Sequence, residues 1–220
     1  GTYAFQEMLP TEAELTAEFG STRNTVRRAL SMLADGMFVQ PIHGKGVRVI
    51  WLKGETDMLG ALEEVESFGE FAKRNNAVAS TDVKSFEHLV CTEQLSRRLG
   101  FKVGEKLIRV VRVRSLNGNA RQVDHGYFLE SIAKGLTPEI AARSIYDYLE
   151  HKRGVKVMAS RRTVSVELAN DEDCSYLDLG KYNCVAVMES QSYTSDGILF
   201  EVTHARTHPE IFHYRVNSKR

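Results

Sequence analysis

An internal repeat of hairpins places the strongest constraint on the fold of this chain. Two stretches in its second half, LGFKVGEKLIRVVRVRSLNGNARQVDHGYF and LGKYNCVAVMESQSYTSDGILFEVTHART, follow one plan. In each, Leu-Gly ends a short helix, and two β-rich runs flank a turn, Asn-Gly at 117–118 or Asp-Gly at 196–197. Thr92 and Asn170 are residue types that cap the starts of these two helices. Two long hairpins with helices predict an α+β domain built on an antiparallel sheet.

The first 50 residues follow a different plan, in which two helices are joined by a tight turn. Thr11 and Glu14 form a T-x-x-E capping box, and Gly20 ends the first helix. The second helix is expected to start near Ser21 and to end at residues 35–36, Asp-Gly. Only a turn separates the two helices, as in a helix-turn-helix.

The second of these helices has one apolar face and one polar face at about 100° per residue. The apolar face, expected to pack inward, holds Val26, Ala29, Leu30 and Leu33. The polar face holds Arg23, Asn24, Arg27, Arg28 and Ser31. Arginine to guanine, asparagine to adenine and hydroxyl to phosphate are the contacts that a helix makes in a major groove. A solvated helix surface has a similar composition, and the helix alone does not decide between the two.

A basic hairpin is expected directly after this helix. Residues 38–42 and 47–50 form two short strand patterns joined by His43, Gly44, Lys45 and a second glycine. Residues 1–20 carry only acids, whereas residues 21–50 carry Arg23, Arg27, Arg28, Lys45 and Arg48 against Asp35 alone. The formal net charge of +0 therefore hides a positive face on the N-terminal unit. A basic hairpin in this place can act as a wing that touches DNA phosphates or the minor groove.

The stretch LPTEAELTAEFGSTRNTVRRALSMLADGMFVQPIHGKGVRV resembles the winged helix-turn-helix of the GntR family of bacterial repressors. The resemblance covers residues 9–50 and implies operator contacts by the residues matching Thr22, Arg23, Thr25, Arg27, His43 and Gly44. The polar face and the basic wing add Asn24 and Lys45 to this set. Ala13 stands where a DNA-contacting arginine is frequent, so that one contact is not expected here. The family's domain begins with a further helix that this sequence lacks, so a truncated chain is expected. The DNA-binding domain is assigned to residues 1–50 and a linker to residues 51–61.

Composition and motifs argue against a membrane protein, a disulfide-stabilised protein and an enzyme. Apolar residues at 42% and charged residues at 26% are typical of a soluble globular protein. No apolar run is long enough for a membrane span, and the odd cysteines Cys91, Cys174 and Cys184 suit a reducing cytoplasm. P-loop, Rossmann, HExxH and Ser/His/Asp patterns are absent. The sequence therefore predicts no enzyme, no catalytic residue, no cofactor and no metal.

Several residues of the second half could bind a ligand. Arg112 and Arg114 are two apart on a predicted strand, so both point to one face and could hold a phosphate or carboxylate. An exposed sheet face would carry arginines equally well. Ser67 and Ser144 each begin a capping-box pattern, which could be structural or could present an anion site. Acids on the two return strands, Asp124 and Glu201, could bind sugar hydroxyls or face solvent.

The second half also resembles the UTRA effector domain of the HutC branch of GntR regulators, over roughly residues 66–214. SFGEFAK, SIYDYLEHKRGVKV, DEDCSYLDLGKYNCVAV and LFEVTHARTHPEIFHY carry the resemblance. It implies a phosphosugar pocket between the hairpins, formed by positions matching Ser67, Phe68, Arg112, Arg114, Ser144 and Tyr146. Asp124, shorter than the glutamate common in relatives, and Glu201 would lie near sugar hydroxyls. Residues 62–220 are assigned to this effector-binding and dimerisation domain.

The sequence thus predicts a cytoplasmic, homodimeric repressor that leaves its operator DNA when a phosphosugar binds. Trehalose 6-phosphate is the leading effector, and another sugar phosphate, such as an amino-sugar phosphate, is the alternative. A sensor that does not bind DNA is a second class of function. UTRA domains resemble chorismate lyase in fold, so a lyase-like enzyme stays as a third, although a shared fold does not establish activity.

Overall fold

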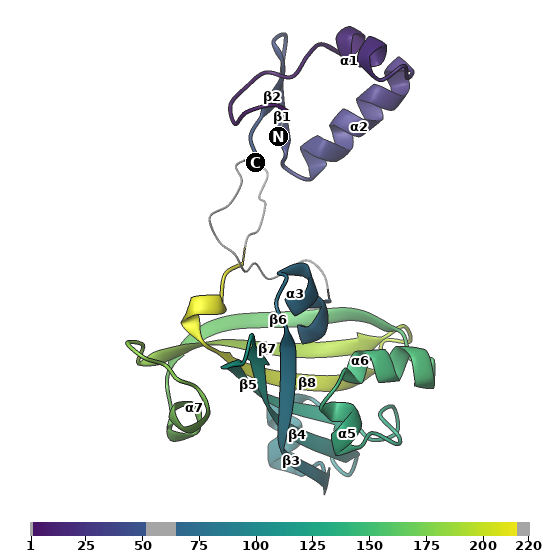
Figure 1. The fold of residues 1–220 in the computed structure, drawn as a ribbon. Helices are drawn as coiled ribbons and strands as arrows, with labels where there is room; N and C mark the ends of the chain where they lie inside the picture. Colours follow the sequence, from purple (N-terminus) through teal and green to yellow (C-terminus); the bar gives the residue numbers. More distant parts are fainter. Residues whose placement is uncertain (1, 52–64, 215–220) are drawn as a thin grey trace. The chain divides into compact units, whose positions relative to one another are not determined.

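The computed structural model describes residues 2–51 and 65–214, which belong to two compact units (Figure 1). Apart from Trp51, the predicted linker over residues 51–61 lies outside the described residues, as does the start of the second domain at residue 62. These boundaries stay predictions. Within the described ranges, no helix has the length and apolar character needed to cross a membrane.

The N-terminal unit contains the two predicted helices, α1 (Glu12–Glu18) and α2 (Arg23–Asp35). The capping box is confirmed: the Glu14 backbone N–H donates to Thr11 Oγ1 at 3.3 Å, and the Thr11 N–H donates to Glu14 Oε2 at 2.7 Å. The start of α2 is fixed by Thr22, whose hydroxyl accepts a hydrogen bond from the Thr25 N–H. The two helices are thus separated by a short turn, as a helix-turn-helix requires.

A short antiparallel hairpin follows α2, with strands β1 (Val39–Ile42) and β2 (Gly46–Val49). The first strand begins one residue later than predicted, and the second begins one residue earlier. Residues 6–9 lie along the other side of β2, where the Gln6 N–H donates to the Val49 carbonyl oxygen at 2.9 Å. The turn that joins β1 to β2 includes Gly44 at a φ of +70°, a backbone conformation that favours glycine. The hairpin occupies the position of a wing.

The apolar face of α2 is only partly covered by the described residues. Val26 is buried, but Ala29 is exposed and Leu33 retains 40% of its surface, so the prediction that both pack inward is wrong for this structure. An apolar cavity of about 680 Å³ lies along this face, between α1, α2 and the hairpin. Those elements line the sides of the cavity without filling it, which is why the two residues stay accessible.

The second unit is built on one six-stranded antiparallel sheet (Figure 1). Its strands are β3 (Ala79–Val90), β4 (Lys106–Leu116), β5 (Asn119–Leu129), β6 (Val157–Leu168), β7 (Cys184–Thr194) and β8 (Leu199–Thr207). Their order is β3-β4-β5-β8-β7-β6, so two three-strand halves meet along β5 and β8. This arrangement confirms the antiparallel α+β fold and the repeat of two hairpins, β4–β5 and β7–β8. The edge strands β3 and β6 were not part of the prediction.

Short helices connect the strands and cover both faces of the sheet. They are α3 (Phe68–Arg74), α4 (Glu93–Leu99), α5 (Pro138–Ala141), α6 (Ile145–Asp147), a π-helical turn (Tyr148–Lys152), α7 (Asp171–Tyr176) and a 3-10 turn (Pro209–Ile211). The predicted caps Thr92 and Asn170 are confirmed at the starts of α4 and α7. Gly100 ends α4 at a φ of +86°, as the Leu-Gly pattern predicts. The same pattern is wrong for α7, which ends at Tyr176 because Leu177 is extended and buried.

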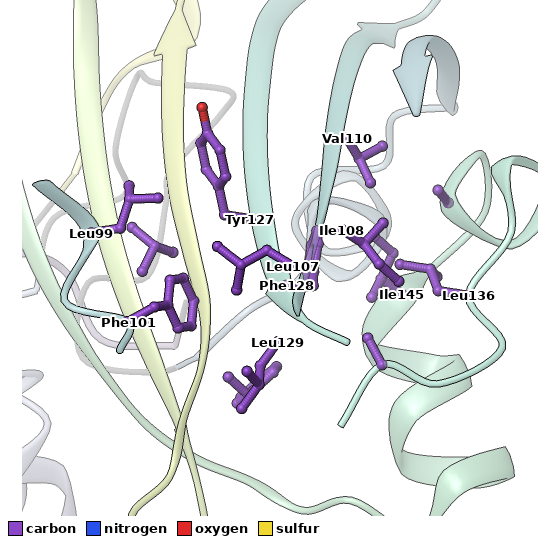
Figure 2. Close-up of a cluster of buried hydrophobic side chains, with 14 of the residues drawn as sticks. Leu99, Phe101, Leu107, Ile108, Val110, Tyr127, Phe128, Leu129, Leu136 and Ile145 are labelled. Carbon is purple, nitrogen blue, oxygen red and sulfur yellow. The ribbon is translucent and has the colours of Figure 1, made fainter. Parts of the chain in front are cut away.

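Buried side chains lie on both sides of the sheet, as Figure 2 shows around β4 and β5. The side chain of Leu99 packs on one side of these strands and that of Ile145 on the other. A second cluster joins Leu177 and Leu179 to β-strand valines. We call the sheet face that carries Arg112 the front face and the opposite one, which carries Val111, the back face. Part of the front face is left open, and the candidate site lies there.

Candidate functional site

The predicted DNA-contact residues lie on exposed parts of the N-terminal unit. All of the α2 candidates are exposed: Thr22, Arg23, Asn24, Thr25 and Arg27. The hydroxyl oxygens of Thr22 and Thr25 lie 2.9 Å apart at the start of α2. His43, Gly44 and Lys45 form the exposed turn of the hairpin. The residues thus fall into a helix group and a hairpin group, as the winged helix-turn-helix prediction requires.

Two of the α2 arginines share one carboxylate, a contact that the sequence did not reveal. Glu12 Oε2 accepts hydrogen bonds from Arg23 Nε at 3.0 Å and from Arg27 Nε at 2.9 Å. The side chains of Arg23, Arg27 and Glu12 are 69%, 56% and 32% exposed, and we call this group the exposed triad. The hydrogen bond from Arg23 and then that from Arg27 lower the pKa of Glu12. The sequence interpretation counted Glu12 only as part of an acidic segment.

The front face of the second unit contains a pocket of about 550 Å³. Strands β3 to β8 supply its floor, while the start of α3, the segment before α6 and the residues after β8 form its walls. Every predicted effector residue lines it: Ser67, Phe68, Arg112, Arg114, Asp124, Ser144, Tyr146 and Glu201. The structure therefore brings together residues that are up to 134 positions apart in the sequence. This volume suits a ligand of small-molecule size.

A second group of two arginines and one carboxylate lies at the β4–β5 side of the pocket. Asp124 Oδ2 accepts from Arg112 Nη2 at 2.5 Å, from Arg114 Nη2 at 2.8 Å and from Arg114 Nε at 3.1 Å. The side chains of Arg112, Arg114 and Asp124 are 3%, 13% and 3% exposed, and we call them the buried triad. The prediction that both arginines share one sheet face is confirmed. Their common partner was not predicted.

A β-bulge sets this contact. The hairpin starts with the pairs Leu116↔Asn119 and Ser115↔Ala120, but the next pair is Arg114↔Gln122. The extra residue on β5 shifts all later pairs by one position and places Asp124 opposite Arg112. Without the shift, Asp124 would point to the back face, because side chains alternate along a strand.

The electrostatics of the buried triad favour an additional anion. Burial alone would raise the pKa of Asp124, but the guanidinium groups of Arg112 and Arg114 outweigh it and hold that pKa at about 2. Burial, followed by the neighbouring Arg114, lowers the pKa of Arg112. Among the described residues, the buried Nε of Arg112 has no hydrogen-bond partner. Two cations against one anion, with one buried donor unused, leave the triad positive and under-satisfied.

Hydroxyl groups and an aromatic ring flank the buried triad. The Phe68 ring centroid lies 5.1 Å from the Arg114 guanidinium carbon, within the range of a cation–π contact. The Ser67 hydroxyl accepts from the Glu70 N–H at 3.3 Å, and the Ser144 hydroxyl accepts from the Asp147 N–H at 3.1 Å. Both serines therefore cap helices as expected. A hydroxyl that accepts one hydrogen bond can still donate its own proton, so both can also contact a ligand.

A different group of polar residues lies near Tyr146. Its hydroxyl donates to Glu201 and lies 3.0 Å from Ser192 Oγ. Burial raises the pKa of Glu201, and burial together with Glu201 raises the pKa of Tyr146 well above its usual range. Hydroxyl groups beside one carboxyl group offer both donors and acceptors, which suits the hydroxyls of a sugar better than a phosphate. The pocket thus has a cationic part and a hydroxyl-binding part.

Several lining residues were missed because they depend on strand pairing across the second half. Arg162 on β6 pairs with Ser190 on β7, which pairs with Thr203 on β8, and all three line the pocket. The sequence analysis predicted neither β6 nor its pairing with β7, so it could not assign Arg162 to the pocket. Two aromatic residues after β8, Phe212 and Tyr214, also line the pocket. Both lie in the stretch LFEVTHARTHPEIFHY, which carries the family resemblance, but neither was assigned to the pocket.

The described part of the chain offers no metal centre, since no three His, Cys, Asp or Glu side chains in it are grouped to hold an ion. The His–carboxylate contacts on the back face are single pairs. His125 Nε2 lies 3.0 Å from Glu172 Oε2, and His204 Nε2 lies 3.7 Å from Glu189 Oε1.

Comparisons with protein families and curated proteins match both units. Residues 1–49 match the model of bacterial regulatory proteins of the gntR family, and residues 74–213 match the UTRA domain. The HTH-type transcriptional regulator TreR of Bacillus subtilis is 31% identical over 214 residues, or 97% of this chain and 89% of that protein. The HTH-type transcriptional repressor NagR of the same organism is 26% identical over 199 residues, or 90% of this chain and 79% of NagR.

Solved structures share the fold. The transcriptional regulator YydK from Bacillus subtilis superimposes with a TM-score of 0.75 at 22% identity, covering 99% of this chain and 92% of that one. The effector-binding domain of the Bacillus subtilis trehalose repressor gives a TM-score of 0.57 at 27% identity, covering 64% of this chain and 98% of the domain. The first match concerns the fold alone, whereas the second also shares sequence over the unit that contains the pocket.

Proposed function

We propose that this chain, which belongs to the GntR family of bacterial regulatory proteins and carries a UTRA domain, represses transcription as an operator-bound homodimer. A phosphosugar in the pocket of the second unit releases the repressor from DNA. Three features support this assignment: the exposed basic face of α2, the basic turn of the hairpin, and the pocket lined by all eight predicted effector residues. The cytoplasm is the compartment where operator DNA is found.

The operator contacts are assigned to the two exposed groups. Arg23 and Arg27 on α2 read base edges together with Asn24 and the hydroxyls of Thr22 and Thr25. His43, Gly44 and Lys45 at the hairpin turn contact phosphates or the minor groove. A helix-turn-helix that reads one half-site gains affinity and register when two copies bind a palindrome, which is the reason to expect a homodimer.

The observation that carries the effector assignment is the buried triad. Its two guanidinium groups carry one more positive charge than Asp124 balances, and both arginines line the pocket, where an anion bound by charge-assisted hydrogen bonds is favoured. The hydroxyls of Ser67 and Ser144 add neutral donors around a phosphate. Tyr146, Glu201 and Thr203 lie where sugar hydroxyls would be bound. A ligand that fits both parts of the pocket has one anionic group and several hydroxyls, as a phosphosugar does.

Trehalose 6-phosphate is our leading effector, because a relative that is 31% identical is a trehalose repressor by name and matches nearly the whole chain. Another sugar phosphate, such as an amino-sugar phosphate, is the alternative, since both would use the same cationic part of the pocket. The residues near Tyr146 and Glu201 would distinguish the two sugars, because they contact the part of the ligand in which the sugars differ. A lyase-like enzyme is distinguished by turnover: an effector recovered unchanged after incubation argues against it.

Titration calorimetry on the full chain tests the effector site. Trehalose 6-phosphate should bind, and trehalose should bind far more weakly because it lacks the phosphate. Arg112→Ala should weaken phosphosugar binding about 10- to 150-fold, the value of one charge-assisted contact. Arg109→Ala is the matched control, because Arg109 lies on the same strand with its side chain on the back face, where it pairs with Glu87. Equal affinity for both sugars, or an unaltered affinity in Arg112→Ala, would refute the phosphate site.

Release from DNA imposes a second requirement. If the effector lowers operator affinity by some factor, the operator must lower effector affinity by the same factor. Repeating the titration with saturating operator DNA therefore tests the repressor function separately from the pocket. An effector that binds equally well with and without operator would leave the pocket assignment intact but contradict induction.

A further inference from the structure

One arginine of the edge strand β6 points into the pocket, and its neighbour does not. The half-buried side chain of Arg162 lines the pocket, as does that of Ser160, two residues before it. Because side chains alternate along a strand, both point to the front face. Arg161 lies between them, so it points to the back face, and it is exposed. Two adjacent arginines thus have separate surroundings, and only one of them can contact a ligand in the pocket.

Three strands separate Arg162 from the two arginines of the buried triad. The sheet order places β5, β8 and β7 between β4 and β6. At a spacing of about 4.8 Å between neighbouring strands, β4 and β6 are about 19 Å apart along the sheet. A ligand whose phosphate is bound by Arg112 and Arg114 has to extend across β8 and β7 to reach Arg162. A second sugar ring, linked to the first, supplies length in this direction.

Hydroxyl groups line the way from β8 to β6. In the strand register Arg162 lies opposite Ser190 on β7, which lies opposite Thr203 on β8, and all three line the pocket. In the next row along the strands, Ser160 lies opposite Ser192, and the Ser192 hydroxyl donates to Ser160 Oγ at 3.4 Å. Hydroxyl groups can donate and accept at once, as the hydroxyls of a sugar do. This part of the floor therefore suits an uncharged, hydroxylated part of a ligand.

The formal charges of the lining residues also favour an uncharged group near β6. In the described part of the chain, the charged lining residues outside the buried triad are two arginines and two glutamates, Arg143, Arg162, Glu66 and Glu201. Their formal charges cancel, whereas the buried triad has two arginines against one carboxylate. A second anionic group on the ligand would find no excess positive charge outside the triad. The contact partner of Arg162 is thus better sought among sugar hydroxyls.

Two tyrosines that line the pocket place the charge of Arg162 in its hydroxyl-binding part. Burial raises the pKa of Tyr214, and the positive charge of Arg162 opposes this rise. Burial and Glu201 raise the pKa of Tyr146, and the charge of Arg162 opposes that rise as well. The guanidinium group is therefore within electrostatic reach of both phenol groups. It lies beside the group that is assigned to sugar hydroxyls and not beside the buried triad.

We propose that Arg162 is a specificity-determining residue that binds hydroxyls of a second sugar ring, so that the pocket prefers a disaccharide phosphate to a monosaccharide phosphate. The buried triad holds the phosphate, the first ring lies over β8, and the second ring reaches β6. The planar guanidinium group carries several N–H donors in a fixed geometry, which can contact neighbouring hydroxyls of one ring. This inference rests on the phosphosugar in the proposed function and assigns the reading of ligand length to one side chain.

Titration calorimetry on the full chain tests this role with trehalose 6-phosphate and glucose 6-phosphate, which share the phosphorylated ring. Wild type should bind the disaccharide phosphate at least about 10-fold more tightly. Arg162→Met should weaken trehalose 6-phosphate about 10- to 150-fold and glucose 6-phosphate less than about 3-fold, so the preference is lost. Arg162→Lys keeps the charge without the planar fork, so it should weaken trehalose 6-phosphate and leave glucose 6-phosphate unchanged.

Arg161→Met is the matched control, because it removes the same charge from the same strand on the back face and should change neither affinity. Circular dichroism of each variant checks that the sheet is folded. An equal loss for both sugars in Arg162→Met, or an unaltered preference, would overturn the role of Arg162. A wild type that binds glucose 6-phosphate or glucosamine 6-phosphate as tightly as trehalose 6-phosphate would overturn it as well. Binding of none of the three would instead contradict the phosphosugar in the proposed function.

Discussion

The same chemical group, two arginines on one carboxylate, occurs once in each unit of this protein. In the exposed triad Glu12 holds Arg23 and Arg27, and in the buried triad Asp124 holds Arg112 and Arg114. The hydrogen-bond distances are similar, at 2.9 to 3.0 Å and 2.5 to 3.1 Å. The surroundings differ completely, since the exposed triad is in water and two members of the buried triad retain only 3% of their side-chain surface.

The difference shows how burial decides what such a group can do. Exposed ion pairs contribute little to stability and exchange readily with other partners. In the proposed operator complex, Arg23 and Arg27 would therefore leave Glu12 for DNA at small cost. Removing one partner from a buried ion pair is costly, so Arg112 and Arg114 are held in one geometry before a ligand arrives. One triad is suited to exchanging partners and the other to a fixed, preorganised site.

The largest expected effect is on the stability of the second unit. Asp124→Asn leaves two buried guanidinium groups without their counter-charge and should lower its free energy of unfolding by about 3–5 kcal/mol. Glu12→Gln, the matched change in the exposed triad, should leave the melting temperature of the N-terminal unit unchanged within error. Differential scanning calorimetry of the full chain measures both. Equal effects of the two substitutions would remove the proposed distinction between the triads.

A smaller effect is expected in acid. The folded-state pKa of Asp124 is about 2, below the ordinary 3.8, so its charged form stabilises the fold above about pH 4. This contribution is lost as the pH falls from 3.8 toward 2, and it amounts to about 2 kcal/mol. Urea unfolding of wild type and Asp124→Asn between pH 5 and pH 2 should show the gap between them narrowing by this amount. A constant gap would contradict the charged state assigned to Asp124.

Substitutions on the exposed surface of the N-terminal unit should leave stability unchanged and affect only DNA binding. Arg23→Ala should cost about 1–3 kcal/mol on the operator and relax its sequence preference, because Arg23 is expected to read a base. Lys45→Ala should weaken operator and unrelated DNA by the same factor, because a phosphate contact carries no sequence information. Fluorescence anisotropy at one fixed salt concentration compares them. Arg23→Ala that binds both DNAs as wild type does would show that α2 is not the recognition helix.

Local patterns in the sequence predicted much of this structure. The capping boxes at Thr11 and Ser67 and the Asn-Gly turn at 117–118 act over a few residues, so their geometry follows from residue types alone. The alternation of Arg112 and Arg114 is local as well. The positions of Ser67, Ser144 and Tyr146 in one pocket came from a family resemblance, because no local rule connects segments so far apart.

Long-range register accounts for what the sequence did not predict. A simple two-residue turn would set Arg112 opposite Val123, and only the bulge brings Asp124 there instead. No residue type near Arg121 announces that bulge. The edge strands β3 and β6 have many polar residues and weak periodicity, so neither was predicted, and the pocket position of Arg162 was lost with them. The Leu-Gly pattern after α7 was wrong because tertiary burial of Leu177 ended that helix early.

The mirrored strand order, β3-β4-β5 beside β8-β7-β6, has a consequence for how ligand preference could be changed. The floor of the pocket crosses the boundary between the two halves, and each half contributes a different chemistry. The first supplies the buried triad, while the second supplies Ser190, Thr203 and Glu201 together with Arg162. If the phosphosugar assignment is correct, substitutions at Ser190 or Thr203 should alter which sugar is accepted and leave the buried triad in place. Under the proposed function, the two halves of the sheet thus separate sugar selection from anion binding.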